Sequence, residues 1–127
     1  MILVLKTAGD PTEIYLLGLS GDIIKQKVWS AERRLAHDLI GEIEDLLDKD
    51  FTKLSGVVVF RGPGSFTGLR IGITTANALA YGQNIPIVGT NGENWLKDGI
   101  EKLSDKKNDK VVLPEYGAPA NITKPRK

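Results

Sequence analysis

The residues that could do chemistry gather around one glycine-rich stretch, GPGSFTGLRIG, at positions 62–72. This stretch follows the apolar run GVVVF and precedes ITTANALAYG, so a strand, a turn and the start of a helix come in succession. Free backbone N–H groups and the positive end of a helix dipole meet at such a place, which makes it a possible anion site. The known phosphate signatures do not fit, because Thr67 stands where a third glycine belongs and no Gly-Lys-Ser/Thr follows.

A structural interpretation explains more of the same turn. Gly62 and Gly64 allow a sharp reversal of the chain, and Pro63 fixes one dihedral angle. Ser65 or Thr67 can cap the helix that follows. We therefore expect this turn chiefly to start a helix, with anion binding as the alternative.

Candidates for catalysis are few. His37 is the single histidine, and on an amphipathic helix without a cysteine or a Ser-His-Asp set it is better explained as a polar interface or surface residue. Ser65 does not satisfy G-x-S-x-G, because it directly follows Gly64. Arg70 sits in the first helical turn, where its charge opposes the dipole, so a carboxylate or phosphate partner is plausible. We assign no catalytic residue, no metal ligand and no cofactor.

The helix after the turn carries a stripe of small residues. Gly68, Gly72, Ala76 and Ala80 recur every four residues and so share one face. Two glycines inside a helix cost about 1 kcal/mol each relative to alanine, so close packing against a neighbour is expected. The sequence predicts a self- or hetero-dimer interface made of Leu35, His37, Leu39, Gly68, Arg70, Gly72, Ala76 and Ala80. Alternatively the stripe packs on the sheet of its own chain, and the interface lies on the adjacent helical face.

Composition sets the class of protein. The chain has 127 residues, 17 Lys and Arg against 16 Asp and Glu, and no cysteine. This length suits one domain, the charge of +1 offers no global attraction for nucleic acid, and disulfides and cysteine-bound metals are excluded. The apolar N-terminus is broken by Lys6, too early for a signal peptide or a membrane span, so we expect a cytoplasmic protein.

The hydrophobic periodicity predicts the elements that position the turn. Alternating or wholly apolar runs predict strands, and Leu35, Leu39 and Ile43 recur at helical spacing after Ser30, a plausible N-cap. The expected order is β-β-β-α-β-α-β-α, an α/β fold with a mixed five-stranded sheet and helices packed on it. The expected strands cover residues 2–8, 12–20, 23–29, 54–60 and 85–90, and the expected helices 31–49, 67–83 and 91–104.

The composition changes after Ser104. We expect a domain over residues 1–104, then a charged linker and extended C-terminal tail over 105–127. Four apolar residues in this tail are expected to dock onto the domain. They are Val111, Val112, Leu113 and Tyr116.

The turn GPGSFTGLRIG, its alanine-rich helix and the preceding HDLIGEIEDLL together resemble the TsaB (YeaZ-type) family. Residues 1 to about 104 resemble the family's N-terminal domain, a half-unit of the actin/Hsp70/sugar-kinase (ribonuclease H-like) fold. The resemblance implies a non-catalytic scaffold that binds the TsaD-type threonylcarbamoyl transferase, in an assembly completed by the TsaE-type ATPase. Such an assembly makes threonylcarbamoyladenosine in tRNA, and this chain would meet tRNA only indirectly.

Two departures from the family stand out. Lys6 lies where the family's first strand usually ends in an aspartate, and a lysine cannot ligate Mg²⁺. The family's second domain has no counterpart here, so we expect a version reduced to the N-terminal domain. The alternative function is a small enzyme of the actin-like fold, a phosphotransferase or a peptidase.

Overall fold

The fold is built on one mixed sheet of five strands. The computed structural model describes residues 1–115, and the order of strands across the sheet is β3-β2-β1-β4-β5. β1 pairs antiparallel with β2 and parallel with β4, so the expected mixed sheet is confirmed. The strands are β1 (Ile2–Lys6), β2 (Thr12–Leu17), β3 (Ile23–Trp29), β4 (Gly56–Gly62) and β5 (Ile87–Asn91).

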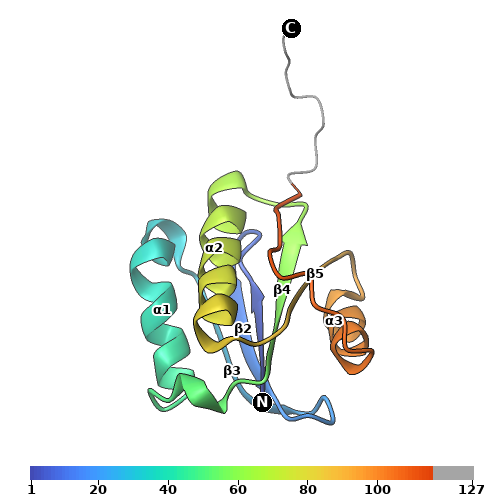
Figure 1. Cartoon of the computed structure of the whole chain (residues 1–127). Coiled ribbons are helices and arrows are strands. Elements are labelled where there is room, and N and C mark those ends of the chain that lie inside the picture. Colours follow the sequence, from blue (N-terminus) through green and yellow to red (C-terminus); the bar gives the residue numbers. More distant parts are fainter. Residues whose placement is uncertain (116–127) are drawn as a thin grey trace, which may run out of the picture.

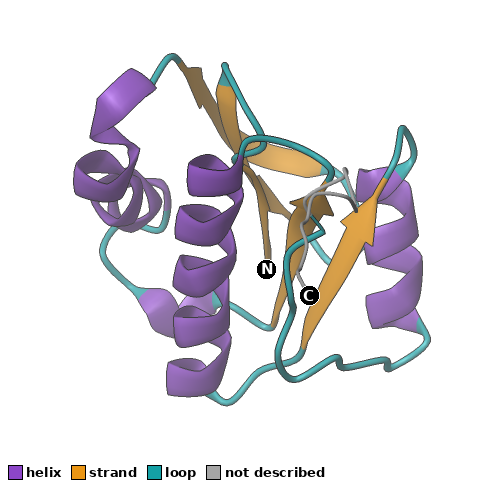
Figure 2. Ribbon diagram, turned by 90° about the horizontal axis from the view of Figure 1, so that it is seen from above, coloured by secondary structure: helices purple, strands orange, loops and turns teal. Residues whose placement is uncertain are grey.

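Helices cover the sheet unequally. α1 (Leu35–Leu46) and α2 (Phe66–Gln83) lie on one face, and α3 (Trp95–Ser104) lies on the other (Figure 1, Figure 2). Successive side chains of a strand point to opposite faces of the sheet. β1 therefore buries Leu3 and Leu5 on the face covered by α1 and α2, and Val4 on the face covered by α3. Two short 3₁₀ turns, Glu32–Arg34 and Phe51–Lys53, flank α1.

The structure corrects the expected starts of the first and third helices. Ser30 does not cap α1, which begins at Leu35 after the 3₁₀ turn and without a side-chain cap. Asn91 does not start the third helix, because it is the last residue of β5 and α3 begins at Trp95. The second helix matches the expectation closely, and Asn84 ends it in the left-handed conformation.

The small-residue stripe of α2 packs inside the chain. Gly72, Ala76 and Ala80 are buried, and a Cβ built on Gly72 would lie 2.0 Å from Thr7 Oγ1. A Cβ on Gly68 would lie 2.3 Å from the Thr7 carbonyl oxygen. The stripe therefore lets α2 approach the end of β1, and the expectation that it faces another molecule is corrected in favour of packing against the sheet.

Residues after α3 run along the outer edge of β5, the last strand of the sheet. Asn108 Oδ1 accepts from Ile87 N at 3.1 Å, and Asp109 Oδ2 accepts from Gly89 N at 2.8 Å. Val112 is 3% exposed, and Asn77 bonds both its N–H (2.9 Å) and its carbonyl (3.0 Å). We call residues 108–115 the strap.

Of the three described residues that were expected to dock, Val112 is the one whose side chain is buried. Val111 and Leu113 are 62% and 66% exposed, and Tyr116 lies outside the described residues. Among residues 1–115 no helix combines the length and apolar character that crossing a bilayer requires.

Candidate functional site: the glycine-rich turn and the outer face of α2

Close backbone approach explains the glycines of the turn. Gly62 has φ of +129°, and a Cβ there would lie 1.9 Å from the carbonyl oxygen of Glu115. A Cβ on Gly64 would lie 2.5 Å from the Cβ of Ala8 in the β1–β2 loop. The next residue, Ser65, donates its N–H to the Ala8 carbonyl at 2.7 Å. The turn is therefore held between the β1–β2 loop and the strap.

Ser65 starts α2, as the sequence predicts. Its Oγ accepts from Gly68 N at 3.3 Å, and its carbonyl accepts from Leu69 N at 2.9 Å. Thr67 is exposed and does not cap the helix. A cavity of about 280 Å³ opens between this helix start, the β1–β2 loop and the 3₁₀ turn before α1.

The outer face of α2 carries the exposed members of the site. Phe66 is 56% exposed, and the Arg70 guanidinium carbon lies 5.3 Å from the centroid of its ring, a cation–π contact. A shallow hollow of about 320 Å³ lies here. It is lined by Phe66, Thr67, Arg70, Ile71, Thr74 and Thr75. Tyr81, near the end of the helix, is 90% exposed.

The predicted interface residues divide between surface and core. Arg70 and His37 are exposed, while Leu35 and Leu39 are 7% and 1% exposed and pack in the core. Leu35 and Leu39 therefore act by fixing α1 on the sheet, not by contacting a partner. On the outer side of α1, Ile40 is 42% exposed, a residue that the sequence reasoning did not select. The sequence signal for Ile40 was an apolar residue at the flank of the buried stripe of the same helix.

His37 takes part in a small polar cluster on α1. Its Nδ1 lies 2.9 Å from Asp38 Oδ1 and 3.1 Å from Arg34 Nη2. Hydrogen bonding from His37, aided by the charge of Arg34, lowers the pKa of Asp38. In residues 1–115 no hydrogen bond joins His37 to Ser65 or Thr67. The structure does not bring these three together as a catalytic set.

Lys6 has a role that sequence reasoning missed. Its Nζ lies 4.7 Å from the ring centroid of Phe60 and 5.7 Å from that of Trp95. The two rings meet edge to face, 5.7 Å apart. Within the described residues no group of three acidic or histidine side chains is placed to hold a metal ion. The sequence signal for this contact was that Lys6 and Phe60 each end an apolar run, and that these two runs form adjacent strands.

Known proteins share sequence and fold with this chain. The family model for TsaD, tRNA N6-adenosine threonylcarbamoyltransferase, matches residues 29–109. TsaB of Bacillus subtilis is 45% identical over 89 residues, which cover 63% of this chain and 36% of that protein. TsaB of Escherichia coli is 34% identical over 86 residues, covering 58% and 37%. A Pseudomonas aeruginosa structure described as similar to peptidase YEAZ superposes with a TM-score of 0.64 at 28% identity, covering 71% and 42%.

The mixed sheet with two helices on one face and one on the other, shared with that structure, defines an α/β protein of the actin-like, ribonuclease H-like class. Because the TsaD family model matches more than half of the chain, the chain belongs to the family that this model defines. It is also similar to the TsaB (YeaZ-type) proteins of two bacteria. It spans little more than a third of the length of the two TsaB relatives.

Proposed function

We propose that this chain is a non-catalytic subunit in the threonylcarbamoyladenosine modification of tRNA, and that it binds a TsaD-type transferase subunit. The family supports the pathway, since TsaB relatives are named for threonylcarbamoyladenosine biosynthesis. The observation that carries the binding role is the outer face of α2, where the exposed side chains of Phe66 and Arg70 line a hollow beside the half-buried Ile71.

This outer face has the character of a helix-packing surface. Aromatic residues and arginine are both enriched in the buried centres of protein interfaces. Thr67, Thr74 and Thr75 around it are small and leave room for side chains of a second helix. The buried stripe holds α2 close to β1 and so keeps this face rigid. Arg70 would meet a carboxylate of the partner, while the TsaE-type ATPase would join the larger assembly.

Binding to a purified TsaD-type subunit tests this role directly. Phe66→Ala and Arg70→Glu should each weaken the complex by tenfold or more, about 1.4 kcal/mol, if the two residues lie at its centre. Val111→Ala and Lys97→Glu are controls, because they shorten an exposed apolar side chain on the strap and reverse an exposed positive charge on α3. Equal binding by all four variants would place the partner elsewhere; no binding by the unaltered chain would refute the role.

A nucleotide assay tests the alternative, a small enzyme of this fold. We expect the isolated chain to hydrolyse no ATP above background, because Lys6 stands at the end of β1 where a metal-directing acid would be needed. Turnover that disappears in Lys6→Ala or Gly64→Ala would show an active site in this chain and overturn the proposal.

A further inference from the structure

The two edges of the sheet differ sharply. At β5 the strap and α3 occupy the outward backbone groups: Asp109 N donates to the Ile87 carbonyl at 2.8 Å, and Lys102 Nζ donates to the Gly89 carbonyl at 3.1 Å. At β3, the other edge, no backbone group bonds to any described residue outside the ladder with β2. A bare edge of seven residues is a template for another strand.

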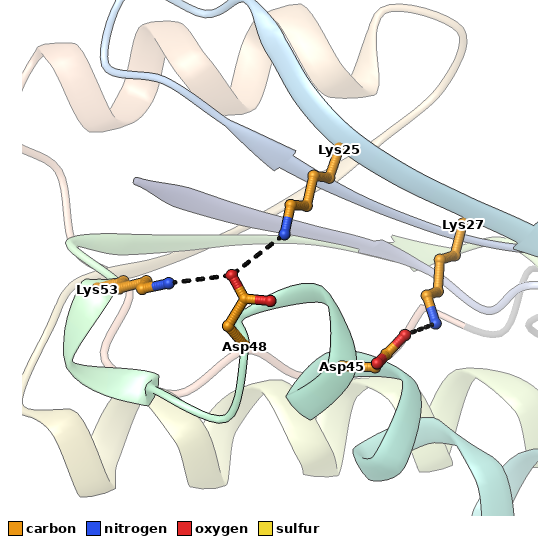
Figure 3. A network of polar contacts seen from close by, with 5 residues as sticks. All are labelled: Lys25, Lys27, Asp45, Asp48 and Lys53. Carbon is orange, nitrogen blue, oxygen red and sulfur yellow. Dashed lines mark hydrogen bonds and ion pairs between the residues drawn. The ribbon is translucent and has the colours of Figure 1, made fainter.

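Lysines on an edge strand normally oppose its pairing with another strand, and β3 has two lysines. Both are held by acids of the chain's own α1 layer (Figure 3). Lys25 Nζ lies 3.3 Å from Asp48 Oδ2, and Lys27 Nζ lies 2.6 Å from Glu42 Oε1 and also contacts Asp45. The positive charge on this face is therefore already compensated, which removes much of the repulsion that would oppose pairing.

The opposite face of β3 is exposed and carries apolar side chains on both sides of Gln26. Ile23, Ile24 and Val28 are 50%, 45% and 50% exposed, because α3 packs mainly on β4 and β5. A bulge opposite Leu16 and Leu17 lies at the start of the strand, and Lys25–Trp29 is regular. These exposed branched side chains are suited to cross-strand packing.

The sequence of β3 is nearly symmetric about Gln26. Lysines flank it on both sides, and Ile24 and Val28 follow at equal distances. A strand of this kind is complementary to itself when two copies run antiparallel about a twofold axis. We propose that β3 pairs with β3 of a second copy of this chain, Gln26 opposite Gln26 and Ile24 opposite Val28.

This surface is separate from the outer face of α2, because α1 packs on β3 whereas α2 packs on β1 and β4. Pairing at β3 therefore leaves the proposed transferase site open. Each copy brings three lysines and three acids to this face, so their charges balance within each copy. They are Lys25, Lys27, Lys53, Glu42, Asp45 and Asp48.

Cysteine cross-linking tests the pairing and its register, since the chain has no cysteine of its own. Opposed residues in antiparallel strands have Cα atoms about 4.5–5.5 Å apart, which a disulfide can span. Gln26→Cys should form a covalent dimer at least about tenfold faster than Glu93→Cys, an exposed control in the loop before α3. Ile24→Cys mixed with Val28→Cys should cross-link faster than either alone. Equal rates for Gln26→Cys and Glu93→Cys would overturn the proposal.

Sedimentation of the unaltered chain gives a second, independent readout. The mass should rise with concentration from 13.8 kDa towards twice that value. Val28→Lys should keep the circular dichroism spectrum but remain a monomer, whereas Val111→Lys, an exposed control on the strap, should still dimerise. A monomer at every concentration, or a dimer unaffected by Val28→Lys, would refute pairing through β3. Loss of transferase binding in Phe66→Ala would leave this result unchanged.

Discussion

The ammonium group of Lys6 lies over the ring of Phe60, 4.7 Å from its centroid, at the end of the central strand. Trp95, the first residue of α3, completes the contact from the other side at 5.7 Å. A charge that would be costly beside an apolar surface is thus stabilised by two aromatic rings. Lys6 therefore links β1, β4 and α3, and the position is structural.

Replacing Lys6 should lower stability modestly. Lys6→Gln keeps the length of the side chain but removes the charge, so we expect a loss of about 0.5–1 kcal/mol in the free energy of unfolding. Urea unfolding measures this, and Lys97→Gln, on the exposed side of α3, should change little. A Lys6→Gln protein as stable as the unaltered one would show that the ring contacts contribute nothing.

Two glycines of α2 should respond in opposite directions to alanine. Gly72→Ala places a Cβ 2.0 Å from Thr7 Oγ1, so the helix must shift and stability should fall by about 1–3 kcal/mol. Gly82→Ala meets nothing within 4 Å and should gain up to about 1 kcal/mol from helix propensity. Thermal unfolding of the two variants is the measurement, and an equal response in both would contradict close packing of the stripe.

Asp48 should make stability sensitive to acid. Hydrogen bonds from Lys25 and Lys53 lower its pKa below the ordinary 3.8, so the folded state favours the carboxylate (Figure 3). This contribution is present above pH 3.8 and is lost as the pH falls through the lower pKa of the folded state. Asp48→Asn should flatten that part of the stability profile. Asp98→Asn, which removes an exposed carboxylate of α3, should leave it intact.

Opening the strap should expose it to protease. Val112→Ala removes two buried methyl groups beside Gly89, for which we expect a loss of about 1–3 kcal/mol in docking. Trypsin should then cut faster after Lys107 and Lys110, as followed by mass spectrometry. Val111→Ala is the control because its side chain is 62% exposed. Equal cleavage of both variants would mean that Val112 does not hold the strap.

The sequence was a good guide where a local pattern decides structure. Alternation predicted β3. Ser65 was one of the two caps predicted for the second helix, because a hydroxyl cap needs only a backbone group three residues away. The cap predicted at Ser30 was wrong, and the third helix begins at Trp95, not near Asn91 as predicted. In both places the chain must first leave a strand and turn, and the hydrophobic anchors Leu35 and Trp95 decide where the helix begins.

Long-range contacts were beyond local reasoning. The small residues from Gly68 to Ala80 predicted close packing of the helix. The packing partner, Thr7, could not be predicted, because it is brought beneath the helix by the parallel pairing of β1 with β4. The ring contacts of Lys6 likewise join residues from three elements. Of the candidate site, Arg70 and His37 were placed on the surface as expected, while Leu35 and Leu39 were misjudged because buried and interfacial leucines share one spacing.

The bonding of Asn108 and Asp109 to β5 also limits how large an assembly can grow. A sheet with two open edges can add molecules indefinitely and become a fibre. With one edge terminated by its own side chains, this sheet can be extended in a single direction. Pairing between sheet edges must then stop once a second molecule has been added. The hydrogen bonds that hold the strap on β5 therefore also prevent the growth of larger aggregates.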